Sequence, residues 1–229
     1  MTTTTTQKRI LIATTSHTQL GDTGKPTGAY LAEVAHPHAA FVRAGHGVEF
    51  ASVRGGQIPL DGVADADAGS RAFLEAHGAE LASSQAAASV DPARYDAIFF
   101  AGGHGTMWDL PEDAAFQRVA AAIYQRGGVV AAVCHGPAAL VNLRLADGRY
   151  LVDGKRVSAV TNEEERAVQL EGVVLFLLAD ALVARGAPHV PAPSWKSHVV
   201  VSERLVTGQN PASATGVAEA VVKVLAGEA

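Results

Sequence analysis

Short, mainly apolar runs constrain the fold of this chain more than any other sequence feature. Four of them lie at residues 10–15, 48–53, 95–100 and 129–133, separated by polar loops and helical patterns. Such runs are typical of strands that are covered on both faces, and helices between them indicate parallel crossovers. The sequence therefore predicts an α/β fold with a doubly wound, mostly parallel sheet.

The remaining elements follow from apolar periodicity and turn residues. We expect a helix over 28–44 that breaks or kinks near Pro37 and ends at Gly45. Asn162 is expected to cap a helix that begins with Glu163–Glu165. The other predicted elements are small helices over 67–81, helices over 111–126, 173–185 and 212–225, a strand over 156–160, and paired strands over 198–201 and 204–208.

Length and composition limit the class of protein. The chain has 229 residues, 48% of them hydrophobic, which suits one domain over 1–229 with a flexible tail at residues 1–8. A net charge of -5 without a basic run argues against nucleic-acid binding, and no apolar stretch is long enough to predict a membrane span. A single cysteine excludes an intramolecular disulfide and favours a reducing cytoplasm.

The run at 129–133 leads directly into that cysteine. Cys134 is followed by His135, Gly136 and Pro137, and then by an Ala/Leu-rich helical pattern. Small residues around a nucleophile on a tight strand-to-helix turn are typical of a nucleophile elbow, and a helix N-terminus favours the thiolate. The alternative is that Cys134 is a small buried apolar residue, which is common for a free cysteine.

Two other loops are expected to lie near Cys134. Ligands of open α/β sheets bind beyond the carboxyl ends of the strands, where the loop after Thr15 and the segment Gly102–Gly105 also fall. Gly102 and Gly103 allow close backbone approach and offer N–H groups to a ligand. His104 either lines this site or only satisfies its own loop.

Carboxylates and further histidines complete the set of candidates. Glu33 lies within an apolar helical stretch, so it is either a buried site residue or an exposed position on an amphipathic helix. One of Glu163–Glu165 could orient His135, although such a run is most often a solvated helix start. His36 and His38 lack the spacing of a metal motif, and we expect no metal and no cofactor.

Three segments together resemble the ThiJ/PfpI superfamily. They are 131–137 around Cys134, Ala101–Gly105, and Thr207–Ser213, and the run 33–37 with the loop to Gly28 is similar to a branch of small heat-inducible chaperones. Members of this branch act as glutathione-independent glyoxalases (glyoxalase III). The resemblance covers about residues 8–225.

The resemblance implies a flavodoxin-like, class I glutamine amidotransferase-like three-layer sandwich that forms a homodimer. It implies that Cys134 is the nucleophile, His135 its partner and Glu33 the pocket carboxylate. Glu165 would complete a triad, with Glu163 and Glu164 as alternatives. Backbone N–H groups of Gly103 and His135 would form an oxyanion hole, with Gly102 and His104 near the substrate.

The implied activity converts methylglyoxal, or another small aldehyde, to a 2-hydroxy acid such as lactate through a Cys134 hemithioacetal. Glutaminases with this fold label carry a late His-x-Glu pair, and no His-x-Glu occurs in this sequence. Glutaminase activity is therefore not expected. A holdase chaperone, a redox sensor based on Cys134, and a hydratase of another electrophile such as an isonitrile are the alternatives, and proteolysis is disfavoured.

Overall fold

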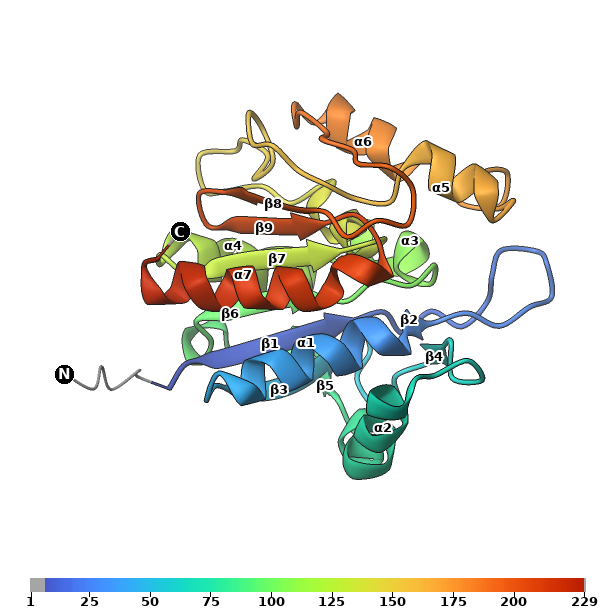
Figure 1. Cartoon of the computed structure of the whole chain (residues 1–229). Helices are drawn as coiled ribbons and strands as arrows, with labels where there is room; N and C mark the ends of the chain where they lie inside the picture. Colours follow the sequence, from blue (N-terminus) through green and yellow to red (C-terminus); the bar gives the residue numbers. More distant parts are fainter. Residues whose placement is uncertain (1–6, 229) are drawn as a thin grey trace.

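The computed structural model describes residues 7–228, and within them seven strands form one sheet. The strand order is β5-β3-β1-β6-β7-β9-β8, and every neighbouring pair is parallel except β8 and β9. Helices cover both faces of this sheet, which gives three layers (Figure 1). The predicted doubly wound, mostly parallel α/β sheet is confirmed.

The sheet strands and a second, two-stranded pairing of β2 with β4 account for all strands among the described residues. Their bounds are β1 Arg9–Thr14, β2 Ala29–Tyr30, β3 Gly47–Ser52, β4 Leu60–Asp61, β5 Gln85–Ala86, β6 Ala97–Phe100, β7 Val129–Val133, β8 Val199–Ser202 and β9 Leu205–Gly208. The α-helices are α1 Leu31–Arg43, α2 Ala68–Leu81, α3 Thr106–Asp109, α4 Ala114–Gln125, α5 Asn162–Ala167, α6 Leu178–Ala184 and α7 Ala214–Ala226. Short 3-10 helices lie at 87–89, 92–94, 110–112, 136–140 and 211–213.

The central strands are apolar on both faces because each face has its own core. In β1, Ile10 and Ile12 pack with α1, α2 and α7, while Leu11 and Ala13 pack with α3, α4 and α6. All four side chains are fully buried. Alternate strand residues point to opposite faces, so a strand between two helical layers must be apolar throughout.

The sheet winds outward in both directions from the boundary between β1 and β6. The chain passes from β1 to β3 and β5 on one side, and then returns to build β6, β7 and β9 on the other. A crevice forms beyond the carboxyl ends of the strands at such a switch point. Thr14, Phe100 and Val133 end their strands there, which brings the predicted site loops together.

Two helical predictions differ from the structure. Helix α1 runs through Pro37 without a break. Proline removes one N–H, whose usual acceptor is the Glu33 carbonyl four residues earlier, and the buried face from Leu31 to Phe41 holds the helix across this gap. Residues 67–81 form one helix and not several, because Asp67 caps α2 by accepting from the Ser70 N–H at 3.0 Å.

The predicted strand over 156–160 is wrong. These residues are largely buried and extended, but their N–H groups go to unrelated segments. Val157 donates to Pro188, Ser158 to the Thr207 hydroxyl and Val160 to the Cys134 carbonyl. Within the described part of the chain, residues 156–160 make a single isolated bridge, between Val157 and His189, so no ladder develops.

Three helix boundaries also move. Thr161, not Asn162, caps α5, because Thr161 and Glu164 form a reciprocal capping box. The predicted helix 173–185 begins only at Leu178, since Leu177 is extended. After Cys134 the chain forms a five-residue 3-10 helix, Gly136–Leu140, with N–H groups bonded three residues back, in place of an α-helix.

Two other expectations concern the chain as a whole. Of the predicted tail at residues 1–8, the first six lie outside the described residues. None of the helices described here is both long and apolar enough to cross a membrane.

Gly136 lies where the turn after β7 packs tightly against the end of β6, and a substitution there tests this packing. A Cβ at Gly136 would lie 2.3 Å from the Phe100 carbonyl oxygen, whereas one at Gly78 in α2 would meet nothing within 4 Å. We expect Gly136→Ala to lower the free energy of unfolding by about 1–3 kcal/mol or more. Gly78→Ala should raise it by up to about 1 kcal/mol. Chemical denaturation measures both, and equal effects of the two substitutions would contradict the packing described.

Candidate active site

The backbone holds Cys134 in a strained turn at the end of β7. Its φ of 60° lies in the left-handed region, which is uncommon for a residue other than glycine. The Cys134 N–H donates to the Gly208 carbonyl at 2.9 Å, and its carbonyl accepts from the Val160 N–H at 3.0 Å. These bonds fix the turn from both sides, and strain of this kind persists where the surroundings over-determine it.

The helix expected directly behind Cys134 is not an α-helix. The helix behind the turn is the short 3-10 helix 136–140, which has little dipole. Burial raises the pKa of the Cys134 thiol, while a hydrogen bond from the His135 N–H lowers it. Burial therefore opposes ionisation of Cys134, and a base beside Sγ would assist it.

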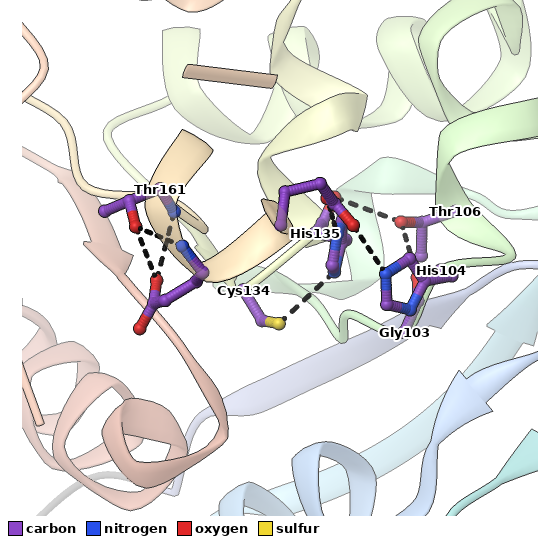
Figure 2. Close-up of polar contacts among 8 residues, drawn as sticks. Gly103, His104, Thr106, Cys134, His135 and Thr161 are labelled. Atoms are coloured by element: carbon purple, nitrogen blue, oxygen red, sulfur yellow. Dashed lines mark hydrogen bonds and ion pairs between the residues drawn. The ribbon is translucent and has the colours of Figure 1, made fainter. Parts of the chain in front are cut away.

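His135 lies in a position from which it can act as that base. The Cys134 Sγ and His135 Nδ1 are 3.4 Å apart, and His135 Nε2 lies 2.7 Å from Glu165 Oε2 (Figure 2). Burial and the nearby His104 lower the pKa of His135, so its ring is neutral. Its Nε2–H donates to Glu165, which leaves Nδ1 as an acceptor toward the thiol.

Glu165 is shared between two imidazoles. His104 Nε2 lies 2.9 Å from its Oε1, and the His104 and His135 rings are 4.1 Å apart between centroids. Burial raises the pKa of Glu165, but the hydrogen bonds from both histidines outweigh it and hold the pKa at about 2. Glu165 is therefore a carboxylate hydrogen-bonded to His135, which is the geometry of the third member of a triad.

The other two acidic residues of this run lie elsewhere. Glu163 is exposed, and Glu164 is buried in hydrogen bonds to Thr161, Trp195 and the amides after β9. Only Glu165 contacts His135. The sequence alone does not choose among the three, because the choice depends on where Thr161 starts the helix.

His104, His135 and Glu165 also carry the donor atoms of a candidate metal site. These atoms all lie within 4.8 Å of one another. Two imidazoles and a carboxylate are a donor set that suits Zn²⁺ or Fe²⁺. Here each imidazole instead donates to Glu165, so the donor atoms already have partners within the protein.

Glu33 faces the thiol from the other side, in the first turn of α1. Its side chain is fully buried, and Oε2 accepts from the Gly102 N–H at 2.9 Å. Oε1 makes no hydrogen bond within residues 7–228. Burial raises the pKa of Glu33 to about 8, although Cys134 and Gly102 lower it. A carboxyl that keeps its proton near neutral pH can both donate and accept a proton.

The glycines after β6 make this approach possible. A Cβ at Gly102 would lie 2.3 Å from Glu33 Oε2, and one at Gly103 would lie 2.3 Å from the Gly28 carbonyl. The Gly102 N–H is already committed to Glu33, so it is not available to a ligand. Thr106 donates to the carbonyls of Gly103 and His135, which ties the β6 and β7 turns together (Figure 2).

A cavity of about 370 Å³ opens onto Cys134. It contains the expected Glu33, Gly103, His104 and His135, while Glu165 stands behind the imidazoles and Gly102 behind Glu33. Part of its lining was not predicted from the sequence, namely Tyr30, Asp61, Val168, Leu170 and Trp195. No local motif marks these residues, which come from the two short strands β2 and β4 and from irregular segments after α5 and α6.

The loop after Thr15 reaches the same cavity. Thr15 and the Ser16 N–H both donate to Asp109 at 2.8 Å, which fixes the start of the loop. Leu20, farther along, contributes to the cavity lining. The loop extends outward beyond the carboxyl end of β1 (Figure 1).

Comparison with known proteins gives a consistent result. Residues 26–224 match the model of the DJ-1/PfpI family. The chain is 32% identical to glyoxalase 3 of Candida albicans, over 93% of this chain and 97% of that protein. It is also 32% identical to the glutathione-independent glyoxalase HSP31 of Saccharomyces cerevisiae, over 90% of this chain and 93% of that protein.

A solved structure is similar over nearly the same extent. The Rapid Encystment Protein 24 KDa of Francisella tularensis superposes with a TM-score of 0.93 at 38% identity. The alignment covers 96% of this chain and 99% of that chain.

The raised pKa of Glu33 predicts a pH-dependent loss of stability. Its pKa is about 8 in the folded chain against an ordinary 4.5, so the stabilisation that it gives is complete below pH 4.5 and is lost as pH rises through 8. Glu33→Gln cannot ionise. As pH rises through this window, the wild type should therefore lose free energy of unfolding relative to Glu33→Gln, by on the order of 1 kcal/mol per pH unit.

Denaturation at several pH values between 5 and 8.5 measures this difference. Glu75→Gln, on the exposed face of α2, is the matched control and should track the wild type at every pH. A difference between Glu33→Gln and wild type that does not change with pH would refute the assignment of a protonated Glu33.

Proposed function

The chain belongs to the DJ-1/PfpI family, and from this premise we propose that it is a glutathione-independent glyoxalase. Its substrate would be methylglyoxal or a related 2-oxoaldehyde, and its product a 2-hydroxy acid such as lactate. Relatives that it matches over nine-tenths of their length bear the names glyoxalase 3 and glutathione-independent glyoxalase. One observation carries the proposal: the Cys134 thiol lies between a neutral His135 and a Glu33 that keeps its proton.

In the first step the thiol adds to the aldehyde carbon. His135 Nδ1 takes the proton from Sγ as the C–S bond forms, and the proton then passes to the aldehyde oxygen to give a hemithioacetal. The Glu165 carboxylate stabilises the imidazolium that exists in between. N–H groups of Gly103 and His135 are proposed to stabilise the developing oxyanion.

In the second step a proton moves between the two carbons. The neutral His135 takes the proton from the hemithioacetal carbon while the protonated Glu33 gives its proton to the neighbouring carbonyl oxygen, which forms an enediol. The enediol becomes a thioester when its first hydroxyl returns a proton to Glu33 and His135 delivers its proton to the second carbon. Water then cleaves the C–S bond, which releases the 2-hydroxy acid and restores the thiol. The net change is the addition of one water to the aldehyde, so no redox cofactor is required, and the proposed steps use no metal.

The charge of the cavity supports independence from glutathione. None of the described residues that line it is Lys or Arg, while Asp61 and Glu164 are acidic. A glutathione adduct carries carboxylates, which this lining would repel. A neutral aldehyde meets no such penalty.

Assembly and location belong to the same proposal. The family resemblance supports a homodimer, and a single cysteine supports a reducing compartment such as the cytoplasm. No nucleic-acid or membrane partner is proposed.

Removal of the nucleophile is the decisive test. Lactate formation from methylglyoxal, assayed without glutathione, should be easily measured in the wild type and should fall by at least about 10³-fold in Cys134→Ala. The variant should keep its fold, because the residue is small and its bonds to Gly208 and Val160 are made by the backbone. Near-equal activity of a folded Cys134→Ala protein would eliminate this mechanism.

A second prediction separates Glu165 from its neighbours. Glu165→Gln removes the charge that stabilises the His135 imidazolium, so kcat should fall by about 10²–10⁴-fold. Glu163→Gln removes the same charge from the exposed position two residues earlier and should leave kcat within about twofold. Steady-state kinetics on methylglyoxal would measure both, and comparable losses would argue for a general electrostatic effect instead of a triad.

A further inference from the structure

One part of the cavity lining is an apolar wall. It is formed by Leu20, Val160, Val168, Leu170, Trp195 and Pro211. At about 370 Å³, the cavity falls in the range that holds ligands much larger than a three-carbon aldehyde. The wall therefore has room for a substantial apolar group on the substrate.

Trp195 is the distinctive residue of this wall. It remains 49% exposed, although large aromatic side chains gain most from burial. Its φ of 63° is in the left-handed region, where a bulky residue is strained. An exposed tryptophan on a strained backbone, at the mouth of a cavity, points to a function in binding and not in folding.

A buried carboxylate holds Trp195 in this conformation. Glu164 Oε1 accepts from the Trp195 N–H at 2.8 Å. The same oxygen accepts from Gln209 Nε2 at 3.1 Å and from Asn210 Nδ2 at 2.9 Å. Trp195 is thus tied to the turn after β9, whose Asn210 and Pro211 also line the cavity.

The other oxygen of Glu164 connects this wall to the start of α5, the helix that carries Glu165. Oε2 accepts from the N–H and the hydroxyl of Thr161, in the capping box that starts α5. The next residue is Glu165, which orients His135. One carboxylate therefore fixes the position of Trp195 relative to the triad.

We propose that Trp195 determines substrate specificity and that Glu164 is its positioning residue. The aromatic wall would favour neutral 2-oxoaldehydes that carry an aryl or similarly large apolar group on the ketone carbon. This inference rests on the proposed glyoxalase function. Substrates with anionic groups should be disfavoured, because no Lys or Arg is present among the described lining residues.

The test compares phenylglyoxal with methylglyoxal. In the wild type both should be converted, and Trp195→Ala should lower the ratio of their kcat/KM values by about tenfold, mainly through KM for phenylglyoxal. A tenfold change corresponds to about 1.4 kcal/mol, close to the value of one aromatic contact.

Glu164 variants separate positioning from a general loss of structure. Glu164→Gln retains an oxygen for Trp195 and should keep the ratio near that of the wild type, whereas Glu164→Ala should lower it as Trp195→Ala does. Glu163→Ala, at the exposed neighbouring position, is the matched control. In a Trp108→Phe background Trp195 is the only tryptophan, so its emission should shift in Glu164→Ala and remain in Glu164→Gln.

The binding of unreactive ketols at Trp195 can be measured by fluorescence, without any catalytic turnover. In the Trp108→Phe protein, the neutral ketol 2-hydroxyacetophenone should quench Trp195 emission at lower concentration than hydroxyacetone does. If Glu164→Ala does not fold, Trp195→Ala and this titration still decide the question.

The outcomes distinguish the two proposals. A wild type that converts neither aldehyde overturns the glyoxalase function and this inference with it. A wild type that converts methylglyoxal but not phenylglyoxal overturns this inference alone. So does an unchanged ratio in Trp195→Ala, or equal quenching by the two ketols.

Discussion

The crowded contact between the ends of β6 and β7 is the constraint on which the site depends. Gly102 and Gly136 lie where a Cβ would meet Glu33 Oε2 and the Phe100 carbonyl at 2.3 Å. This closeness turns Cys134 into the left-handed conformation and brings Glu33 from α1 against the thiol. Backbone bonds to Gly208 and Val160 then lock the turn from two other segments. The geometry of Cys134 is thus set by the packing of the sheet and not by its local sequence alone.

Two glutamates near this turn have opposite environments. Glu33 is buried with one backbone donor, so its pKa rises to about 8 and it keeps its proton. Glu165 accepts from two imidazoles, so its pKa falls to about 2 and it stays charged. Pairs of titratable groups whose pKa values are pushed apart can serve as acid and base in one site. Here the protonated Glu33 lies beside the Cys134 thiol, and the charged Glu165 is hydrogen-bonded to the far nitrogen of His135. This arrangement suits proton transfer to and from a neutral carbonyl compound.

Much of this arrangement is predictable from sequence, for a definite reason. Apart from Arg9, which is exposed, the residues of β1, β6 and β7 are buried and mostly apolar, so the sheet and the convergence of its loops can be predicted from the apolar runs. The charge state of Cys134 cannot be predicted in this way, because it depends on the length of the helix that follows Cys134 and on the burial of Cys134 and Glu33. The segment 156–160 misleads for a similar reason: it is buried like a strand, but it bonds to three different partners and joins no ladder.

The unpredictable part of the site is also the part that sets its shape. The proposed catalytic groups project from the ends of strands and from α1 and α5, where regular structure fixes their positions. Much of the apolar wall comes from irregular segments, and the carboxylate of Glu164 ties Trp195 to Thr161, Gln209 and Asn210 through hydrogen bonds. Val160 belongs to both parts, because it lines the cavity and its N–H donates to the Cys134 carbonyl. The wall and the surroundings of Cys134 are therefore linked at two places, through Val160 and through Glu164, which is adjacent to Glu165.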